Sequence, residues 1–161
     1  MVDTAPDFTA ILELLMRHQV EFIVVGGVCA VLLGAPVATF DLDIFHSRSN
    51  ENLERLSKAL QELEAHYRDH LPDQIEPKLA GLANTGHHLL TTKFGPLDVM
   101  GSIGVDDDYI ALEDHIERVS ISEGLTIRIL NLDTLITVKQ KTARSKDNYM
   151  LEILRAMKER F

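Results

Sequence analysis

Two aspartates interrupt an apolar segment in the first third of the chain. Asp41 and Asp43 stand in "TFDLDIF", residues 39–45, where polar and apolar residues alternate. Residues two apart in a β-strand share a face, with side chains about 6.5–7 Å apart at their bases, so both carboxylates could bind one cation. An unpaired buried carboxylate is costly, and Mg²⁺ prefers oxygen ligands. The pair predicts a metal site, and an exposed edge strand is the alternative explanation.

A third acid, Asp98, interrupts another apolar run, "GPLDVMG", residues 95–101. If the two predicted strands are neighbours, three carboxylates converge. Three acids that hold two metal ions can clamp a triphosphate for in-line phosphoryl or nucleotidyl transfer. One ion would activate the acceptor hydroxyl, and the other would neutralise the triphosphate and the leaving pyrophosphate. Taken alone, Asp98 could equally be a residue that flanks a turn.

The glycine pair Gly26-Gly27 ends the apolar run "VEFIVV" and precedes a short apolar helix. Glycine lets a phosphate approach the backbone closely, and the N-terminus of a helix favours anions. A tight turn between strand and helix would explain the pair about as well.

Hydrophobic periodicity predicts the elements that must position these residues. The expected helices cover residues 8–19, 28–34, 51–70, 131–142 and 146–159. The expected strands cover residues 20–27, 39–45, 87–94, 97–103, 116–121 and 125–131. The expected N-caps of the first and third helices are Asp7 and Asn50. The expected turns are Gly95-Pro96 and Glu123-Gly124. The order of these helices and strands predicts the fold class α+β (α/β).

The 161 residues suggest one domain over residues 1–161, with a core over about 7–130 and C-terminal helices over about 131–160. The net charge of −9 argues against a dedicated nucleic-acid binder. Residues 137–161 nevertheless carry +4, which would suit a phosphate-bearing ligand or an ordinary solvated helix face. Without a signal pattern or a long apolar run, a cytoplasmic location and no membrane partner are expected. The lone cysteine, Cys29, is expected to be buried packing.

These motifs together resemble a known superfamily. "GG" followed by a helix and "TFDLDIF" resembles the GG…T-x-D-x-D signature of polymerase-β-like nucleotidyltransferases, and Asp98 in "LDVM" resembles their third acid. The run "NLDTLITVKQKTARSKDNYMLEIL" resembles the L-x-x-L-x-x-x-K…R-x-K-D helix pair of small bacterial members, including AbiEii-type toxins. The resemblance covers roughly Glu21 to Leu154. It implies the nucleotidyltransferase fold, a mixed β-sheet flanked by helices with a C-terminal helix pair.

The resemblance also implies roles for individual residues. Asp41, Asp43 and Asp98 would bind metal, with Asp98 also acting as base towards the acceptor hydroxyl. The implied nucleotide-binding residues are Gly26, Gly27, Thr39, Lys139, Arg144, Lys146 and Asp147. The implied ligands are a nucleoside triphosphate and Mg²⁺ (two ions) or Mn²⁺. The acceptor would be a hydroxyl of tRNA, protein or a small molecule, and an antitoxin could be a partner.

Two positions depart from the pattern. Val37 stands where relatives often carry Arg, so a basic contact to substrate is missing or is supplied from elsewhere. Met150 stands where many carry a second acid. Neither change removes a metal ligand, but both motivate an alternative, a catalytically silent binding or regulatory protein with this fold. An antibiotic nucleotidyltransferase is a further alternative. His66 and His70, four apart on the predicted helix, are expected to be surface residues rather than zinc ligands.

Overall fold

The computed structural model describes residues 5–70, 73–104, 109–142 and 147–160, and it contains one seven-stranded mixed sheet in the order β3-β4-β5-β2-β1-β7-β6. The strands are β1 (Phe22–Val25), β2 (Leu42–His46), β3 (His66–Tyr67), β4 (His87–Thr92), β5 (Gly95–Met100), β6 (Ile116–Ser122) and β7 (Leu125–Leu130). The α-helices are α1 (Phe8–Arg17), α2 (Gly26–Leu32), α3 (Asn50–Glu62), α4 (Leu79–Leu82), α5 (Leu132–Thr142) and α6 (Asp147–Arg160). Two 3₁₀ helices, η1 (Arg68–His70) and η2 (Ile110–His115), complete the described elements.

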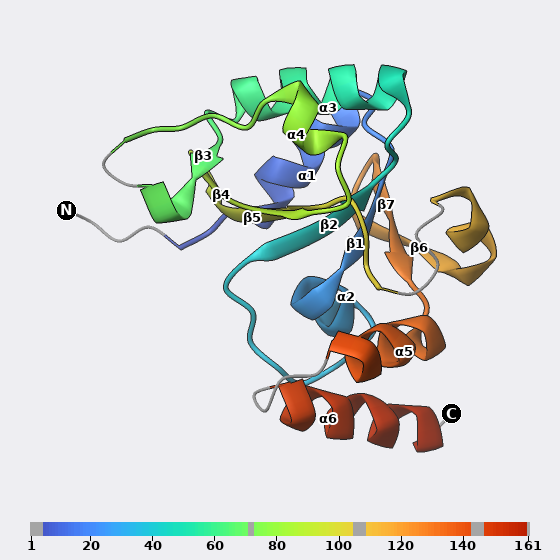
Figure 1. Ribbon diagram of the computed structural model, residues 1–161. Coiled ribbons are helices and arrows are strands. Elements are labelled where there is room, and N and C mark those ends of the chain that lie inside the picture. The colour runs from blue at the N-terminus through green and yellow to red at the C-terminus, as the bar shows by residue number, and fades with distance from the viewer. Residues whose placement is uncertain (1–4, 71–72, 105–108, 143–146, 161) are drawn as a thin grey trace.

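The helices form two layers around the sheet. Helices α1 and α3 cover one face, and α2, α5 and α6 lie on the other (Figure 1). Helix α1 buries Ile11, Leu12 and Leu15, and α3 buries Leu53 and Leu56, as the helical spacing of their apolar residues predicts. The expected mixed sheet with a C-terminal helix pair is confirmed. None of the described helices combines the length and the apolar character that a membrane crossing requires.

The N-cap of α1 is Asp7, as expected, whose carboxylate accepts a hydrogen bond from the Ala10 amide. The expected N-cap of α3, Asn50, is wrong by one residue. Ser49 is the cap, since its hydroxyl accepts from the Asn52 amide, and Asn50 is the first helical residue. Serine and asparagine are about equally good caps, so the sequence alone could not separate them.

The helix expected over residues 51–70 ends at Glu62. Glu64 has a φ of 55°, and the Ala65 amide donates back to the Leu60 carbonyl, which is the hydrogen bond of a Schellman C-cap. His66 and Tyr67 then pair with β4 as the edge strand β3. Backbone pairing with β4 thus overrides the local helical pattern, and His66 and His70 do not share a helix face.

The central strands meet the expectation that the two acid-bearing segments are neighbours. Strand β1 is buried throughout and pairs antiparallel with β2, which pairs parallel with β5. Strand β2 begins at Leu42, so Asp41 lies just before the strand rather than within it. The turn between β4 and β5 falls at residues 93–94, and Gly95 and Pro96 belong to β5.

Cys29 is a packing residue, as expected. It is completely buried in α2, and its thiol donates to the Leu130 carbonyl at 3.4 Å. Burial raises the pKa of this thiol to about 12, which keeps it protonated and unreactive.

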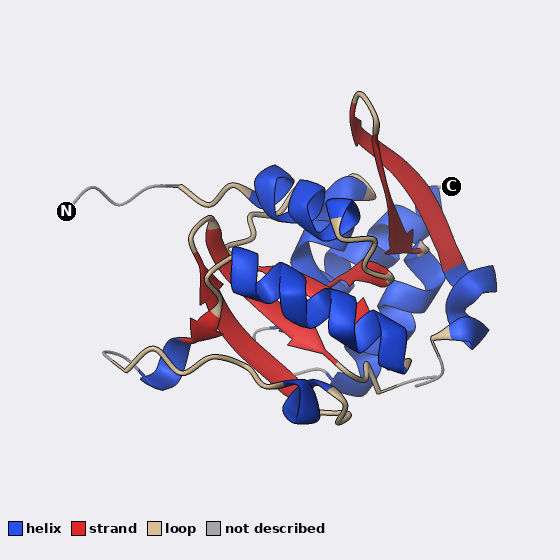
Figure 2. Ribbon diagram, turned by 90° about the horizontal axis from the view of Figure 1, so that it is seen from above, coloured by secondary structure: helices blue, strands red, loops and turns tan. Residues whose placement is uncertain are grey.

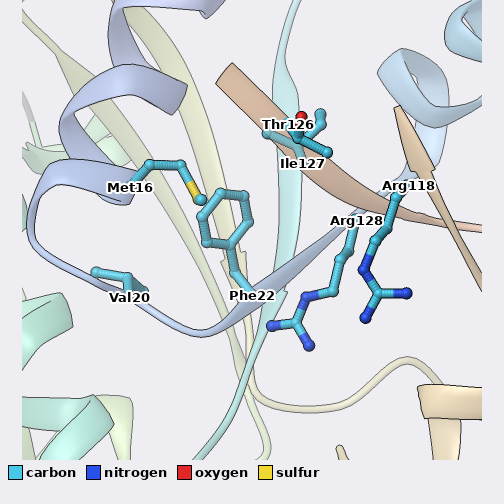
Figure 3. Close-up of a pocket in the computed structure, with 7 residues that line it drawn as sticks. All are labelled: Met16, Val20, Phe22, Arg118, Thr126, Ile127 and Arg128. Atoms are coloured by element: carbon cyan, nitrogen blue, oxygen red, sulfur yellow. The ribbon is translucent and has the colours of Figure 1, made fainter. Parts of the chain in front are cut away.

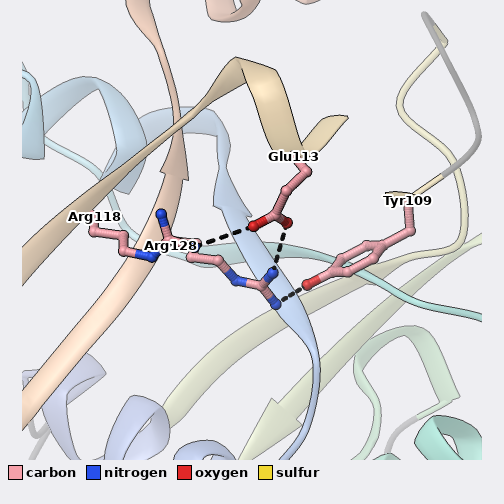
Figure 4. A network of polar contacts seen from close by, with 4 residues as sticks. All are labelled: Tyr109, Glu113, Arg118 and Arg128. Atoms are coloured by element: carbon pink, nitrogen blue, oxygen red, sulfur yellow. Dashed lines mark hydrogen bonds and ion pairs between the residues drawn. The ribbon is translucent and has the colours of Figure 1, made fainter. Parts of the chain in front are cut away.

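The β6–β7 hairpin extends away from the rest of the molecule (Figure 2). Four polar side chains join its base to η2 (Figure 4). Arg118 and Arg128, direct partners across the two strands, donate to the two carboxylate oxygens of Glu113 at 3.1 and 3.2 Å. Arg128 also donates to the Tyr109 hydroxyl. Glu113 therefore offsets the repulsion between two like charges that face each other.

Asn52 is a buried polar residue that joins α3 to the central strands. Its side-chain oxygen accepts from the Glu21 amide at 2.6 Å, and its amide group donates to the Glu21 and Ser47 carbonyls at 3.0 and 2.8 Å. Glu21 immediately precedes β1 and Ser47 immediately follows β2. One side chain thus satisfies three backbone groups at the end of this strand pair.

We expect Asn52→Ala to lower the free energy of unfolding by about 1–3 kcal/mol, because the Glu21 amide loses its partner and the Glu21 and Ser47 carbonyls each lose one of two contacts. Chemical denaturation measures the change. The matched control is Asn50→Ala, at the neighbouring exposed asparagine, which should change stability by less than about 0.5 kcal/mol. Equal effects of the two substitutions would contradict this role for Asn52.

Candidate active site

Three carboxylates converge where β2 and β5 lie side by side. Asp43 and Asp98 are direct register partners on these parallel strands, and Asp41 precedes β2. One carboxylate oxygen of each residue lies within 4.8 Å of the others. Parallel partners present their side chains to the same face of a sheet, so the pairing itself brings Asp43 and Asp98 together.

The three carboxylates are partly buried from solvent, which disfavours three negative charges. Burial, followed by the charges of Asp98 and Asp41, raises the pKa of Asp43 to about 8. Burial also raises the pKa of Asp98, and the nearby Arg68 guanidinium opposes that rise. Without a bound cation, the cluster therefore retains a proton at neutral pH.

The donor set fits a divalent metal ion. The Oδ1 atom of Asp43 is buried and has no hydrogen-bond partner, which is a costly state for a carboxylate oxygen. A cation ligated there would compensate that atom and the mutual repulsion of the three acids. Oxygen donors are the preferred ligands of Mg²⁺ and Mn²⁺, so the chemistry of the cluster matches these ions.

The glycine pair has a packing function that its sequence context did not reveal. Helix α2 begins at Gly26, earlier than expected, and Gly26 has a φ of +67°. A Cβ atom on Gly26 would lie 2.0 Å from Asp43 Oδ2, and one on Gly27 would lie 2.6 Å from Thr39 Oγ1. The pair therefore lets α2 approach the acid-bearing segment at a distance that no side chain permits.

Thr39 supports the site through the backbone. Its hydroxyl donates to the Asp41 carbonyl at 3.1 Å, while its oxygen rests against Gly27. This hydrogen bond fixes the backbone between Thr39 and Asp41. Phe40, between these two residues, is 79% exposed.

The C-terminal helix pair contributes a cation to the site. Lys139 of α5 lies close enough to lower the pKa of Asp43, against the effect of burial. It lines a cavity of about 100 Å³ whose walls also include Gly26, Asp43 and His87 and which is otherwise apolar, formed by Val25, Met100, Ile103, Leu135 and Val138. A positive charge, a carboxylate and apolar walls therefore share one small cavity beside the acids.

The remaining residues of the expected nucleotide site are only partly placed. Arg144 and Lys146 lie outside the described residues, and Asp147 is the first residue of α6. Val37 and Met150, the two departures from the superfamily pattern, are partly buried and pack against the hydrophobic core.

Arg68 belongs to the site, although no sequence signal pointed to it. Its Nη2 atom donates to Asp98 Oδ1 in an ion pair. Arg68 opens η1, directly after the edge strand β3. Because the sequence pattern predicted a helix through this segment, it gave no reason to place Arg68 near the acids.

Comparison with known proteins decides the family. Residues 4–160 match the model of a family described as "Nucleotidyl transferase of unknown function (DUF2204)". The chain belongs to this family. The crystal structure of a "putative nucleotidyltransferase" from Thermotoga maritima has the same fold, with a TM-score of 0.57 and 17% identity over 94% of this chain and 91% of that chain. A search of curated proteins finds no significant match.

Membership of this nucleotidyltransferase family confirms the superfamily and the enzyme class that the motifs predicted. The structural neighbour confirms the fold. Asp43 and Asp98 of this nucleotidyltransferase lie on paired strands, and Asp41 immediately precedes the first of these strands.

The nucleotidyltransferase has another cavity, of about 290 Å³, beside the start of β1 (Figure 3). Phe22, at the start of β1, lines it, whereas the acids lie beside the end of β1 at Val25. The other lining residues are Met16, Val20, Arg118, Thr126, Ile127 and Arg128. Among the described residues, its lining offers no carboxylate of the kind that forms the acid cluster.

The glycine packing can be tested by adding one methyl group. We expect Gly26→Ala to destabilise the protein by about 2 kcal/mol or more, because the new Cβ would overlap Asp43 and the residue would keep a positive φ. Thermal unfolding measures the loss. Gly86→Ala is the control, since a Cβ there meets nothing within 4 Å. Tolerance of Gly26→Ala at wild-type stability would contradict the close packing.

The carboxylate cluster predicts a pH dependence in the metal-free protein. The pKa of Asp43 rises from 3.8 to about 8, so the folded state binds more protons than the unfolded state between these values. The contribution of Asp43 to stability should therefore fall as pH rises from about 4 to about 8. Burial lowers the pKa of His46 from 6.5 to about 4, so this imidazole contributes with the opposite sign in the lower part of the interval. The melting temperature of wild type in EDTA should therefore fall relative to that of Asp43→Asn as pH rises. A wild-type melting temperature that rises relative to that of Asp43→Asn would contradict the prediction.

Proposed function

We propose that this nucleotidyltransferase moves a nucleoside monophosphate from a nucleoside triphosphate to an acceptor hydroxyl, with Mg²⁺ held by Asp41, Asp43 and Asp98. The observation that carries the proposal is the meeting of three carboxylates, with a buried Asp43 oxygen that lacks a partner. Such a group is costly unless a cation compensates it. When bound, Mg²⁺ would supply positive charge for the triphosphate and the pyrophosphate leaving group.

In the proposed reaction, the acceptor oxygen forms a bond to the α-phosphorus, and the bond from that phosphorus to the bridging oxygen of pyrophosphate breaks. The hydroxyl proton passes to Asp98. In the metal-free protein burial raises the pKa of Asp98, and the Arg68 guanidinium opposes this rise. Its register with Asp43 would hold it beside the metal ligands throughout.

We place the triphosphate against Gly26, Gly27 and Lys139. Lys139 supports this assignment because it brings positive charge to the cavity beside Asp43. The apolar walls of the same cavity suit the flat face of a nucleoside base. Thr39 would support the loop, and Arg144, Lys146 and Asp147 are proposed to complete the phosphate contacts from the C-terminal helix pair.

The acceptor is proposed from charge. A chain with a net charge of −9 suits a cationic acceptor, such as a basic protein segment or an aminoglycoside-like small molecule, better than tRNA. A role as the toxin of a toxin–antitoxin pair fits the resemblance to AbiEii-type proteins. A gene for a small transcription-factor-like antitoxin beside this one would favour that role.

The second candidate is a catalytically silent protein with the same fold, which binds nucleotide and regulates a partner. The observation that favours it is the apolar packing of Val37 and Met150, where relatives often carry an arginine and an acid. This candidate predicts nucleotide binding without transfer.

Transfer of label tests the proposal. Incubation with α-³²P-labelled nucleoside triphosphates, Mg²⁺ and separate pools of RNA, protein and aminoglycoside should label one pool. We expect Asp41→Asn or Asp43→Asn to reduce labelling by roughly 10²-fold or more, because several kcal/mol of charge stabilisation depend on each metal ligand. Asp114→Asn, an exposed aspartate in η2, is the matched control.

Calorimetry separates the two candidates. Binding of a triphosphate with Mg²⁺ that is lost in the Asp41→Asn/Asp43→Asn double variant, together with labelling, supports the transferase. The same binding without labelling of any pool supports the silent protein. Triphosphate binding that the double variant leaves unchanged would overturn the proposed metal site.

A further inference from the structure

Arg68 makes a contact with the acid cluster that no part of the proposed reaction uses. Its guanidinium donates to Asp98 Oδ1, with side-chain exposures of 27% for Arg68 and 10% for Asp98. Water and salt screen the attraction within a partly buried ion pair of this kind less than they screen one on the open surface. Asp98 is therefore compensated by the protein's own cation before any metal arrives.

Strand pairing positions this contact. Tyr67 pairs with Leu90 of β4, and the preceding residue of β4, Leu89, pairs with Asp98 of β5. Arg68 follows Tyr67, so its backbone lies beside this row, and its side chain reaches across β4 to Asp98. Arg68 thus approaches Asp98 from the β3 edge, whereas Gly26 approaches the cluster from the β1 side.

The backbone that leads to Arg68 is held in place. The Tyr67 amide donates to the Ile75 carbonyl at 2.9 Å, and the Tyr67 hydroxyl is 2.7 Å from His88 Nδ1. His88 Nε2 in turn lies 3.1 Å from the Gly81 carbonyl. These contacts fix the backbone next to Arg68, so the Arg68 side chain is directed toward Asp98 rather than toward solvent.

The Arg68 guanidinium and a bound metal ion would compete for the Asp98 carboxylate. Both are positive, and both need the same carboxylate. Two cations a few ångströms apart repel each other, most strongly where water is partly excluded. A divalent ion that binds Asp98 must therefore either overcome the repulsion of Arg68 or displace the Arg68 side chain from Asp98.

We propose that Arg68 is a positioning residue that holds Asp98 in the metal-free protein and competes with a divalent cation for that carboxylate. The inference rests on the proposed function, since it needs the three acids to bind metal. It adds a built-in counter-ion, which weakens metal binding before the nucleotide arrives. It also identifies a basic group at the site in a chain whose motif carries Val37 in place of arginine.

Binding of Mn²⁺ in the absence of nucleotide tests the competition. Electron paramagnetic resonance of free Mn²⁺ gives the dissociation constant for wild type and for Arg68→Gln. Removal of one positive charge near the site should tighten Mn²⁺ binding by roughly three- to tenfold. Arg68→Lys, which keeps the charge, should stay near wild type. Arg118→Gln, which removes an arginine from an ion pair at the opposite edge of the sheet, should have no effect.

The outcomes distinguish this inference from the proposed function. Tighter binding in Arg68→Gln alone supports the competition. Unchanged or weaker binding in Arg68→Gln, with wild type binding Mn²⁺ through Asp41 and Asp43, overturns the role of Arg68 and leaves the metal site standing. Absence of Mn²⁺ binding by wild type overturns both.

A measurement on wild type keeps the inference testable if Arg68→Gln does not fold. The Nε–Hε resonance of Arg68, assigned by its absence from the Arg68→Lys spectrum, should shift as diamagnetic Mg²⁺ is added, because the guanidinium leaves Asp98. Hε resonances of arginines remote from the acids, such as Arg118, should stay fixed. An unshifted Arg68 resonance at saturating Mg²⁺ would overturn the competition.

Discussion

The parallel pairing of β2 with β5 is the constraint on which the site depends, because it sets Asp43 directly beside Asp98. Two carboxylates that share a partly buried space repel each other, and Asp41 adds a third charge. The surrounding structure compensates this repulsion in different ways. A proton held by Asp43, the guanidinium of Arg68 and the nearby charge of Lys139 all reduce the net negative charge.

The rest of the fold can be understood as support for this arrangement. The glycines of α2 let the helix approach the acids, and the Thr39 hydroxyl holds the backbone of Asp41. Asn52 secures the opposite end of the β1–β2 pair, and β3 presents Arg68 from the edge of the sheet. Support for the acids therefore comes from elements that are distant in sequence: the early glycine pair by its packing, and the edge strand and a C-terminal helix by the charges of Arg68 and Lys139.

Some errors of sequence-based prediction are as informative as the confirmed elements. The leucine spacing of α3 correctly predicted its buried face, but the pattern gave no sign that the chain would leave the helix after Glu62. Glu64 adopts a positive φ, which is unfavourable for glutamate, so the residue type does not predict this helix end. The backbone groups that leave the helix pair instead in β3, where Tyr67 pairs with Leu90. Arg68 was missed for this reason, since its role depends on a strand of only two residues.

The sequence by itself determined the identity of the acids, the glycine pair before them and the helices and strands with strong periodicity, because residue type and spacing act locally. It also predicted the superfamily, through the order of its motifs. Only the tertiary structure decided that Asp43 and Asp98 are neighbours in register, that the glycines accommodate Asp43 and Thr39, and that Arg68 pairs with Asp98. These contacts join residues far apart in the chain, and their distances follow from strand order and register, which no local pattern encodes.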